Sequence, residues 1–231
     1  MSRLSIIVPA LDEAAGIREC LAALQPMRER GTEVLVVDGG SADATARLAA
    51  PQADRVITAP RGRAAQMNAG AAIAAGDTLL FLHADTRLPE GADGLVLAGL
   101  AASGRAWGRF DVAIEGGSRL LAVVAAFMGA RSRLTAIATG DQAIFVRREA
   151  FRRAGGFPSI ALMEDIAFSR AMKRQGPPLC LRERAVTSAR RWERHGTVRT
   201  ILLMWWLRLA YFLGADPARL AQRYGHGRAA R

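Results

Sequence analysis

The sequence has little cysteine and no long uninterrupted apolar run. Two cysteines, Cys20 and Cys180, are too few for a disulfide scaffold, and we expect both to be small buried thiols. The longest apolar stretch, Ile201–Gly214, contains Arg208 and is shorter than the ~20 residues that a membrane-spanning helix needs. The N-terminus leads into strand-like sequence rather than into a cleavable signal peptide. These absences predict a cytoplasmic protein.

Lysine is nearly absent as well, since Lys173 is the only lysine among 32 basic residues. The 231 residues are 51% hydrophobic and 23% charged, which are globular values and exclude a disordered chain. Residues 1–181 carry 21 basic and 18 acidic side chains, whereas residues 182–231 carry 11 arginines and three acidic residues. A nearly neutral body with a basic tail favours an anionic partner, such as nucleic acid or a membrane surface.

The first half of the chain alternates short apolar runs with alanine-rich helical stretches, a pattern typical of a parallel α/β sheet. Ligands of such sheets bind at the carboxyl ends of the strands, so the loops that follow the strands are the candidate site. The predicted strands are Leu4–Val8, Glu33–Val37, Arg55–Thr58 and Thr78–Leu82, and the predicted helices are Ala15–Met27, Ala42–Ala49 and Ala64–Ala75.

The second half is less regular and has no clear domain boundary before about Thr187. We therefore predict one α/β domain over residues 1–187 and a basic, aromatic-rich helical tail over residues 188–231. The elements predicted here are strands at Trp107–Ile114 and Asp141–Val146 and helices at Ser118–Met128 and Met163–Gln175.

The loops after the second and fourth predicted strands carry acidic side chains that could bind a ligand. Asp38 precedes two glycines and Ser41, which suits either a turn with a capping serine or a carboxylate that binds a base or ribose. Neither the dinucleotide glycine motif nor the P-loop motif is present. His83 and Asp85 end the fourth strand on the same side and could hold Mn²⁺ or Mg²⁺. Equally, they could be a core histidine and a turn residue.

A third acidic pair, Glu164 and Asp165, begins a predicted helix. The helix dipole alone favours carboxylates in a first turn, so a purely structural role explains the pair. The functional alternative is a general base that faces the nucleotide from the opposite side of the cleft.

Five stretches carry a family resemblance in their order along the chain. They are SIIVPALDEAAGI, VVDGGSADAT, RGRAAQMNAGAAIAAGDTLLFLHADT, GDQAIFVRREAFRRAGGFP and MEDIAFSRAMKRQG. Together they resemble the family 2 inverting glycosyltransferases, over about residues 4–187. A narrower resemblance is to a bacterial subgroup often labelled arsenosugar-biosynthesis glycosyltransferases, which also carry FLHADT and a tryptophan-rich C-terminal segment. The resemblance implies the GT-A (Rossmann-like) α/β fold, a mostly parallel sheet flanked by helices, here with a C-terminal helical extension.

The resemblance also implies a reaction, the metal-dependent transfer of a sugar from a nucleotide-sugar, of the UDP type, to a hydroxyl acceptor with inversion. Asp165 corresponds to the catalytic base. Asp85 corresponds to the second carboxylate of the DxD-type metal motif, whose first position is His83 here, so Mn²⁺ or Mg²⁺ is expected on Asp85 with His83 as a weaker ligand. The donor-binding residues that the family pattern implies are Pro9, Ala10, Leu11, Glu13, Asp38, Arg63, Ala84 and Asp85, and the acceptor residues are Asp141, Gln142, Glu164 and Trp192.

The tail suits two kinds of partner. Trp205, Trp206, Tyr211 and Phe212 have the amphipathic or aromatic character found at membrane interfaces, and the arginines would meet anionic lipid on the inner face of the cytoplasmic membrane. Alternatively, this helix packs on the catalytic domain or against a second subunit, which would make a homodimer.

Other function classes fit the sequence less well. A nucleotidyltransferase would need a glycine- and lysine-rich loop after the first strand, which PALDEAAGI is not. A catalytically decayed domain that serves as a nucleotide-binding scaffold gains some support from His83. A nucleic-acid-binding module rests on net charge alone, because outside a hydrophobic helix no aromatic residues are interleaved with the basic patch, and we expect no nucleic-acid partner.

Overall fold

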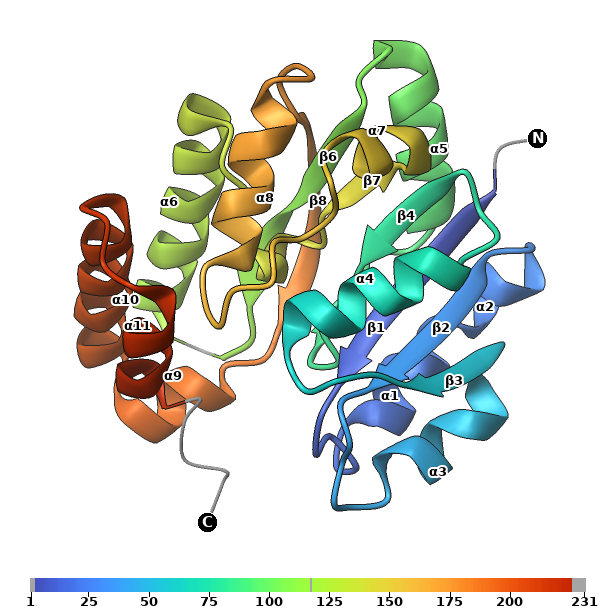
Figure 1. The fold of residues 1–231 in the computed structure, drawn as a ribbon, viewed down its shortest axis with the longest axis horizontal. Helices are drawn as coiled ribbons and strands as arrows, with labels where there is room; N and C mark the ends of the chain where they lie inside the picture. Colours follow the sequence, from blue (N-terminus) through green and yellow to red (C-terminus); the bar gives the residue numbers. More distant parts are fainter. Residues whose placement is uncertain (1–2, 117, 226–231) are drawn as a thin grey trace.

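One eight-stranded mixed sheet forms the centre of the molecule (Figure 1). The computed structural model describes residues 3–116 and 118–225. The strand order is β3-β2-β1-β4-β7-β6-β8-β5. The strands are β1 (Leu4–Ala10), β2 (Glu33–Asp38), β3 (Arg55–Thr58), β4 (Thr78–Phe81), β5 (Thr86–Arg87), β6 (Trp107–Ile114), β7 (Phe145–Arg147) and β8 (Leu179–Thr187).

The first four strands pair in parallel, as the sequence predicts. Every residue of β1, β2 and β4 is buried, because helices cover both faces of this half of the sheet. The connecting helices are α1 (Ile17–Ala22), α2 (Gln25–Glu29), α3 (Thr45–Ala49) and α4 (Arg63–Ile73), with a short 3₁₀ turn, η1 (Ala50–Gln52), after α3.

Two predicted helices differ from the observed ones near their ends. The helix predicted over Ala15–Met27 is two short helices, α1 and α2, because Pro26 lies in the first turn of α2 and has no N–H to continue a single helix. The helix predicted over Ala42–Ala49 begins only at Thr45, whose backbone N–H donates to Asp43 Oδ1 at 2.9 Å.

The second half contains a larger deviation. The strand predicted over Asp141–Val146 is wrong at its start, because residues Gly140–Gln142 form a 3₁₀ turn, η2, closed by a capping box between Thr139 and Gln142. The strand β7 begins only at Phe145, and it runs antiparallel to both β4 and β6. Trp107–Ile114 is a strand as predicted. The helices of this half are α5 (Ala92–Ser103), α6 (Arg119–Thr135), α7 (Arg148–Arg153) and α8 (Glu164–Lys173), of which α5 and α7 were not predicted.

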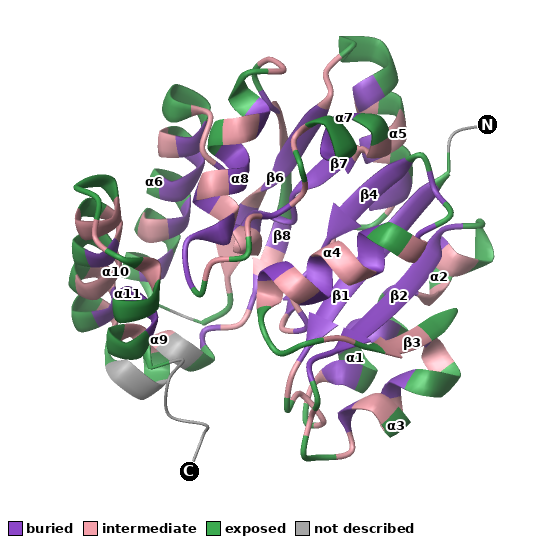
Figure 2. Cartoon of the chain, viewed as in Figure 1, coloured by how far each residue is buried: buried purple, intermediate pink, exposed green. Residues whose placement is uncertain are grey.

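Two hydrophobic cores lie on opposite faces of the sheet, and Figure 2 shows the strands β1, β2 and β4 between them as buried. Alternate residues of β1 serve each core, with Ile6 and Val8 facing α1, α2, α3 and α5, and Ile7 facing α4, α7 and α8. The second core includes a cluster of aromatic rings, among which Phe157 and Phe168 have centroids 4.3 Å apart. Burial of each such side chain contributes about 1.5–3 kcal/mol.

Three helices follow β8 at the C-terminal side of the structure, on the left of Figure 1. They are α9 (Arg190–His195), α10 (Thr197–Phe212) and α11 (Pro217–Tyr224). Leu207 and Leu220 are buried against Leu162, Met163 and Ile166, which precede or begin α8. Within residues 3–116 and 118–225, no helix combines the length and apolarity needed to cross a bilayer.

The two cysteines lie in different environments. Cys20 is buried in α1, as predicted, and burial raises the pKa of its thiol to about 12. Cys180 is only partly buried on β8, so the prediction of a buried thiol is wrong there. Neither thiol forms a disulfide.

Candidate active site

A first cavity of about 330 Å³ lies at the carboxyl ends of β1 and β4, beside the start of α4. It is the position that the parallel strand order favours for a ligand. All the predicted donor residues except Asp38 line it. The full lining is Pro9, Ala10, Leu11, Glu13, Arg61, Gly62, Arg63, Gln66, His83, Ala84 and Asp85.

Hydrogen bonds hold the loop after β1 against the loop after β2. The Asp12 N–H donates to Ser41 Oγ at 2.9 Å, and the Glu13 N–H donates to Thr45 Oγ1 at 2.8 Å. Burial raises the pKa of the Glu13 carboxyl, although the nearby Arg190 guanidinium, 3.4 Å away, opposes this shift. The loop after β1 is therefore held on one side by the segment between β2 and α3, and on the other by Arg190 of α9.

Asp38 does not line the first cavity, because its carboxylate turns into its own loop. Oδ2 accepts hydrogen bonds from the Gly40 N–H at 3.1 Å and the Ser41 N–H at 3.0 Å, and Oδ1 accepts from the Ser41 hydroxyl. These contacts match the turn role that the sequence left open for Asp38. A carboxylate has about four acceptor positions, so one stays available for a ligand.

Gln66 is a site residue that the sequence analysis missed. Its side chain is buried, and Nε2 donates to the carbonyl oxygens of Ala10 and Val37, both at 2.8 Å. Gln66 thus joins α4 to the ends of β1 and β2 and forms part of the cavity wall. The signal in the sequence was an amide side chain, one of two with Asn68, inside an alanine-rich helix.

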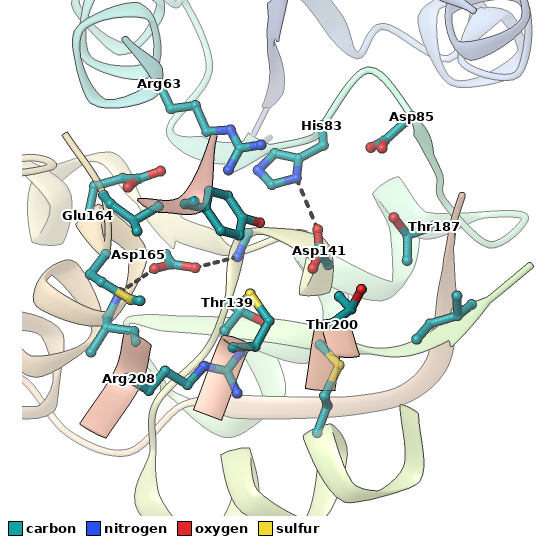
Figure 3. Close-up of a pocket in the computed structure, with 18 of the residues that line it drawn as sticks. Arg63, His83, Asp85, Thr139, Asp141, Glu164, Asp165, Thr187, Thr200 and Arg208 are labelled. Atoms are coloured by element: carbon teal, nitrogen blue, oxygen red, sulfur yellow. Dashed lines mark hydrogen bonds and ion pairs between the residues drawn. The ribbon is translucent and has the colours of Figure 1, made fainter. Parts of the chain in front are cut away.

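A second cavity adjoins the first, and Arg63, His83 and Asp85 line both. Figure 3 shows His83 and Asp85 on one side of it, with Asp165 on the other. Asp85 and Asp165 therefore face the same space, although they come from the end of β4 and the start of α8. The other charged or aromatic lining residues are Asp141, Glu164, Trp192, Arg208 and Tyr224.

The Asp165 carboxylate is held by two backbone N–H groups (Figure 3). Oδ2 accepts from the Gly140 N–H at 3.0 Å, and Oδ1 accepts from the Ile166 N–H at 2.7 Å. Met163, just before α8, has a left-handed φ of 71°, which is uncommon for a residue with a side chain. This turn aims the first residues of α8 into the second cavity.

Glu164 is more deeply buried than Asp165. Burial and the neighbouring Asp165 charge raise the pKa of Glu164, and the Arg63 guanidinium only partly offsets this. For Arg63, burial by itself would lower the pKa. The negative charges of Glu164, Asp141 and Asp165 have the larger effect, so the pKa of Arg63 is raised overall. Arg63 is thus a cation in the wall between the two cavities.

His83 pairs with Asp141, with its Nδ1 lying 3.2 Å from Asp141 Oδ1 (Figure 3). Its ring also packs on Gly140, where an added Cβ would lie 2.3 Å from Nε2. Burial alone would raise the pKa of Asp141, but the His83 hydrogen bond and the charges of His83, Arg63 and Arg208 lower it to about 2. The Asp141 contact engages Nδ1, and Nε2 lies beside Gly140. The role of His83 as a weaker metal ligand stays a prediction.

The fit of a divalent cation rests on Asp85. The described residues contain no group of three or more His, Cys, Asp and Glu side chains that could hold a metal ion. Mg²⁺ and Mn²⁺ at phosphate sites need only one or two carboxylates, since phosphate oxygens and water complete the shell. The Asp85 carboxylate has only a 3.4 Å contact with the Thr86 hydroxyl and lines both cavities, which suits such a ligand.

The structure brings three of the four predicted acceptor residues, Asp141, Glu164 and Trp192, to the second cavity. Gln142 is not among them. Its side chain is fully buried, and Oε1 accepts the Thr139 N–H at 3.1 Å within the capping box. Arg208 and Tyr224 line the cavity from α10 and α11, although the sequence gave no signal that these distant helices return to the site.

Comparison with known proteins agrees with this geometry. The sequence pattern described as glycosyl transferase family 2 matches residues 5–153. This chain belongs to glycosyl transferase family 2. The matched residues run from β1 to α7, so they include the first cavity and the Gly140 turn.

Solved structures confirm the GT-A fold of this family 2 protein. S. aureus TarS 1-349 in complex with UDP-GlcNAc has a TM-score of 0.66 at 17% identity, covering 80% of this chain and 58% of that one. The mannosyltransferase PcManGT from Pyrobaculum calidifontis, in complex with GDP-Man and Mn²⁺, has a TM-score of 0.61 at 23% identity over 80% of this chain and 56% of that one. Glucosyl-3-phosphoglycerate synthase from Mycobacterium tuberculosis has a TM-score of 0.56 at 20% identity, covering 80% of this chain and 71% of that one.

Among curated proteins, the PGL/p-HBAD biosynthesis glycosyltransferases of Mycobacterium tuberculosis and Mycobacterium bovis are 39% identical over 93 residues. The match spans 37% of this chain and 36% of theirs, so it covers about a third of the length of those relatives. None of the similar proteins named here supports the narrower arsenosugar subgroup.

Proposed function

We propose that this family 2 protein transfers a sugar from a nucleotide-sugar to a hydroxyl acceptor with inversion at the anomeric carbon. One observation carries the proposal: Asp85 and Asp165 line the same cavity from different elements, and the first cavity opens beside Asp85. A sugar held between them has its leaving group on one side and a carboxylate on the other. This is the arrangement that a single inverting displacement requires.

The donor would occupy the first cavity. Pro9, Ala10, Leu11 and Glu13 would line the base and ribose, while Ala84 lies buried beside Asp85. The Arg63 guanidinium would bind the diphosphate, because arginine pairs strongly with phosphate oxygens. Asp38 would reach the base with the acceptor position that its own loop leaves available.

A UDP-sugar is the donor we favour. TarS was crystallised with UDP-GlcNAc and the mycobacterial synthase with UDP, whereas the archaeal mannosyltransferase was crystallised with GDP-Man. The latter two structures also contain Mn²⁺. We propose Mn²⁺ or Mg²⁺ as the cofactor and Asp85 as its protein ligand, where the ion would neutralise charge on the departing diphosphate. His83 orients Asp141 in this scheme.

Asp165 is our proposed catalytic base. Its two backbone N–H partners orient the carboxylate and leave acceptor positions for the proton of the incoming hydroxyl. As that oxygen attacks from the Asp165 side, the bond to the diphosphate breaks on the Asp85 side, so the product has the opposite anomeric configuration.

The acceptor would lie in the second cavity. Asp141 and Glu164 offer carboxylate oxygens for sugar or alcohol hydroxyls, and Trp192 offers an aromatic face. Residues 188–231 then act together with the catalytic domain of residues 1–187, because α9, α10 and α11 contribute to this wall. Contact of the tail with a membrane or with a second copy stays a prediction at this point.

A donor panel tests the proposal. UDP-sugars and GDP-sugars are incubated with the protein, Mn²⁺ and a set of hydroxyl acceptors, and nucleoside diphosphate release is measured with the anomeric configuration of the product. We expect release with at least one donor and an inverted product. Nucleotide binding without turnover by any donor would instead favour a decayed scaffold, and a preference for nucleoside triphosphates would favour a nucleotidyltransferase.

A further inference from the structure

The exposed large hydrophobic side chains of the described residues all lie on, or directly after, two helices. These helices are α6 and α10, and they lie side by side in Figure 1. Single exposed hydrophobic side chains are ordinary, whereas one contiguous group of them marks an interaction surface. We call this surface the α6–α10 face.

Helical periodicity generates the face on α6. Leu120, Val123, Phe127 and Leu134 recur at intervals of three, four and seven, so they form one stripe. Phe127 is 58% exposed and Leu134 is 88% exposed. The opposite side of α6 buries Leu121, Ala125 and Met128, so the stripe is a second apolar side that the fold leaves uncovered.

Helix α10 repeats the pattern. Val198, Leu202, Trp205, Leu209 and Phe212 follow one another at intervals of three or four and are all exposed. Trp206 and Leu213 widen the stripe. The two stripes meet, because the rings of Phe127 and Trp205 have centroids 6.0 Å apart.

Helices α6 and α10 contain no acidic residue. Arg119 and Arg199 are exposed at the N-terminal ends of the two helices, whereas Arg133 pairs with Asp111 and Arg208 lines the second cavity. A symmetric contact between two copies would place Arg119 and Arg199 against their own counterparts, with no carboxylate on either helix to compensate. The charge pattern therefore favours an anionic partner over a second copy.

We propose that the α6–α10 face docks on an anionic lipid bilayer surface. Its exposed tryptophans suit the boundary between headgroups and acyl chains, and its leucine, valine and phenylalanine side chains suit the acyl region. Arg119 and Arg199 meet anionic headgroups, each adding to the attraction near the surface. The catalytic-domain helix α6 takes part as much as the tail does, so the docking surface is a feature of the whole fold.

Docking in this orientation places the second cavity close to the lipid headgroups. Met128 of α6 and Met204 and Arg208 of α10 line that cavity from the inner sides of the two docking helices. An amphiphilic molecule held in the bilayer would therefore lie close to the second cavity, next to α6 and α10. The docking itself does not depend on the proposed glycosyl transfer.

Vesicle co-sedimentation of the full chain tests the proposal. Vesicles of phosphatidylcholine alone are compared with vesicles that also contain phosphatidylserine, at low and high salt. We expect binding that requires phosphatidylserine and weakens with salt. The double variant Phe127→Ser/Trp205→Ser should bind about tenfold more weakly, because it removes apolar area from the centre of the face.

Charge-reversal variants supply the matched control. Arg119→Glu/Arg199→Glu changes the α6–α10 face, and Arg18→Glu/Arg47→Glu makes the same change of charge at exposed positions of α1 and α3. We expect the first pair to weaken vesicle binding about tenfold and the second pair to weaken it far less. Thermal unfolding confirms that each variant is folded. Light scattering in the same buffer reports self-association.

Three results would overturn the proposal. The first is no vesicle binding by the folded wild type, the second is equal loss in both charge-reversal pairs, and the third is self-association through Phe127 and Trp205 without vesicle binding. None of these results would bear on the donor panel, which needs no membrane.

Discussion

His83 has contacts in the fold that its position in the sequence does not reveal. It follows β4, a position that suited a metal site, and its Nδ1 lies 3.2 Å from Asp141 Oδ1 while its ring packs on Gly140. The same turn supplies the N–H that orients Asp165. Strand periodicity predicted His83 and Asp85 on one side of a strand, but β4 ends at Phe81 and both residues lie in the segment that follows it. The same periodicity carries no information about a turn 57 residues later.

Replacement of Asp165 by asparagine tests the proposed base. The amide keeps an acceptor oxygen for one backbone N–H but cannot take the acceptor proton, so we expect the transfer rate to fall by about 10²–10⁴-fold. UDP affinity, measured by calorimetry with Mn²⁺, should stay within about twofold. Asp216→Asn, an exposed change at the start of α11, is the control and should leave both values unchanged. Near-wild-type turnover by Asp165→Asn would remove the base assignment.

Replacement of Asp141 by asparagine tests the His83 pair through pH. The pKa of Asp141 is lowered from 3.8 to about 2 in the folded protein, so its ionised form stabilises the fold above pH 4. This contribution is lost as the pH falls from about 4 to about 2. We expect Asp141→Asn to lower the free energy of unfolding by about 1 kcal/mol at pH 6, because the side chain is partly exposed and screened.

Urea denaturation at several pH values measures this difference. The difference in the free energy of unfolding between wild type and Asp141→Asn should become smaller below pH 4. A gap that stays constant down to pH 3 would mean that the His83 contact does not hold the Asp141 charge in the fold.

At the level of elements, the strands were easier to predict than the turns between them. The strands β1, β2 and β4 are apolar and buried, so their sequence alone defines them. The shorter strand β3 is only partly buried. The turn at Gly140 depends on long-range contacts with His83 and Asp165, and local sequence read it as the start of a strand. The helix α5 was missed because its sequence is apolar nearly all round and lacks a clear helical stripe.

Gly140 contacts both His83, which follows β4, and Asp165, at the start of α8. Its replacement by alanine tests whether this double contact positions Asp165. The new Cβ would lie 2.3 Å from His83 Nε2, so either the imidazole or the turn must move. Because the Gly140 N–H also orients Asp165, we expect transfer to fall on the order of 10²-fold while the protein still folds.

A matched glycine change provides the comparison for this element. Gly94 lies in α5, and an added Cβ there has no atom within 4 Å. Gly94→Ala should leave transfer unchanged and raise the free energy of unfolding by about 0.4–1 kcal/mol. Equal activity of the two variants would show that the Gly140 turn has no part in positioning Asp165.

At the scale of the whole molecule, the site joins parts of the chain that no local pattern connects. Post-strand loops predicted most of the first cavity, because parallel strands bring their carboxyl ends together. The second cavity needs α10 and α11, which reach it only after β8 has crossed to the far half of the sheet. The amphipathic character of residues 197–212 predicted a helix with an interaction face but could not indicate that its other side completes a cavity.

Replacement of Arg208 tests whether the C-terminal tail contributes to acceptor binding. Arg208 lines the second cavity from α10, and its charge helps to lower the pKa of Asp141 across that cavity. We expect Arg208→Gln to raise KM for the acceptor about tenfold, the effect of losing one hydrogen bond from a charged group. KM for the nucleotide-sugar should stay within about twofold, because the first cavity does not include Arg208.

Arg219→Gln serves as the comparison, since Arg219 is exposed on α11 and does not line either cavity. Steady-state kinetics with a water-soluble acceptor separate this effect from docking on a bilayer. An equal rise in KM for the donor and the acceptor would contradict this prediction. It would mean that Arg208 affects the structure of both cavities and that α10 has no specific role in acceptor binding.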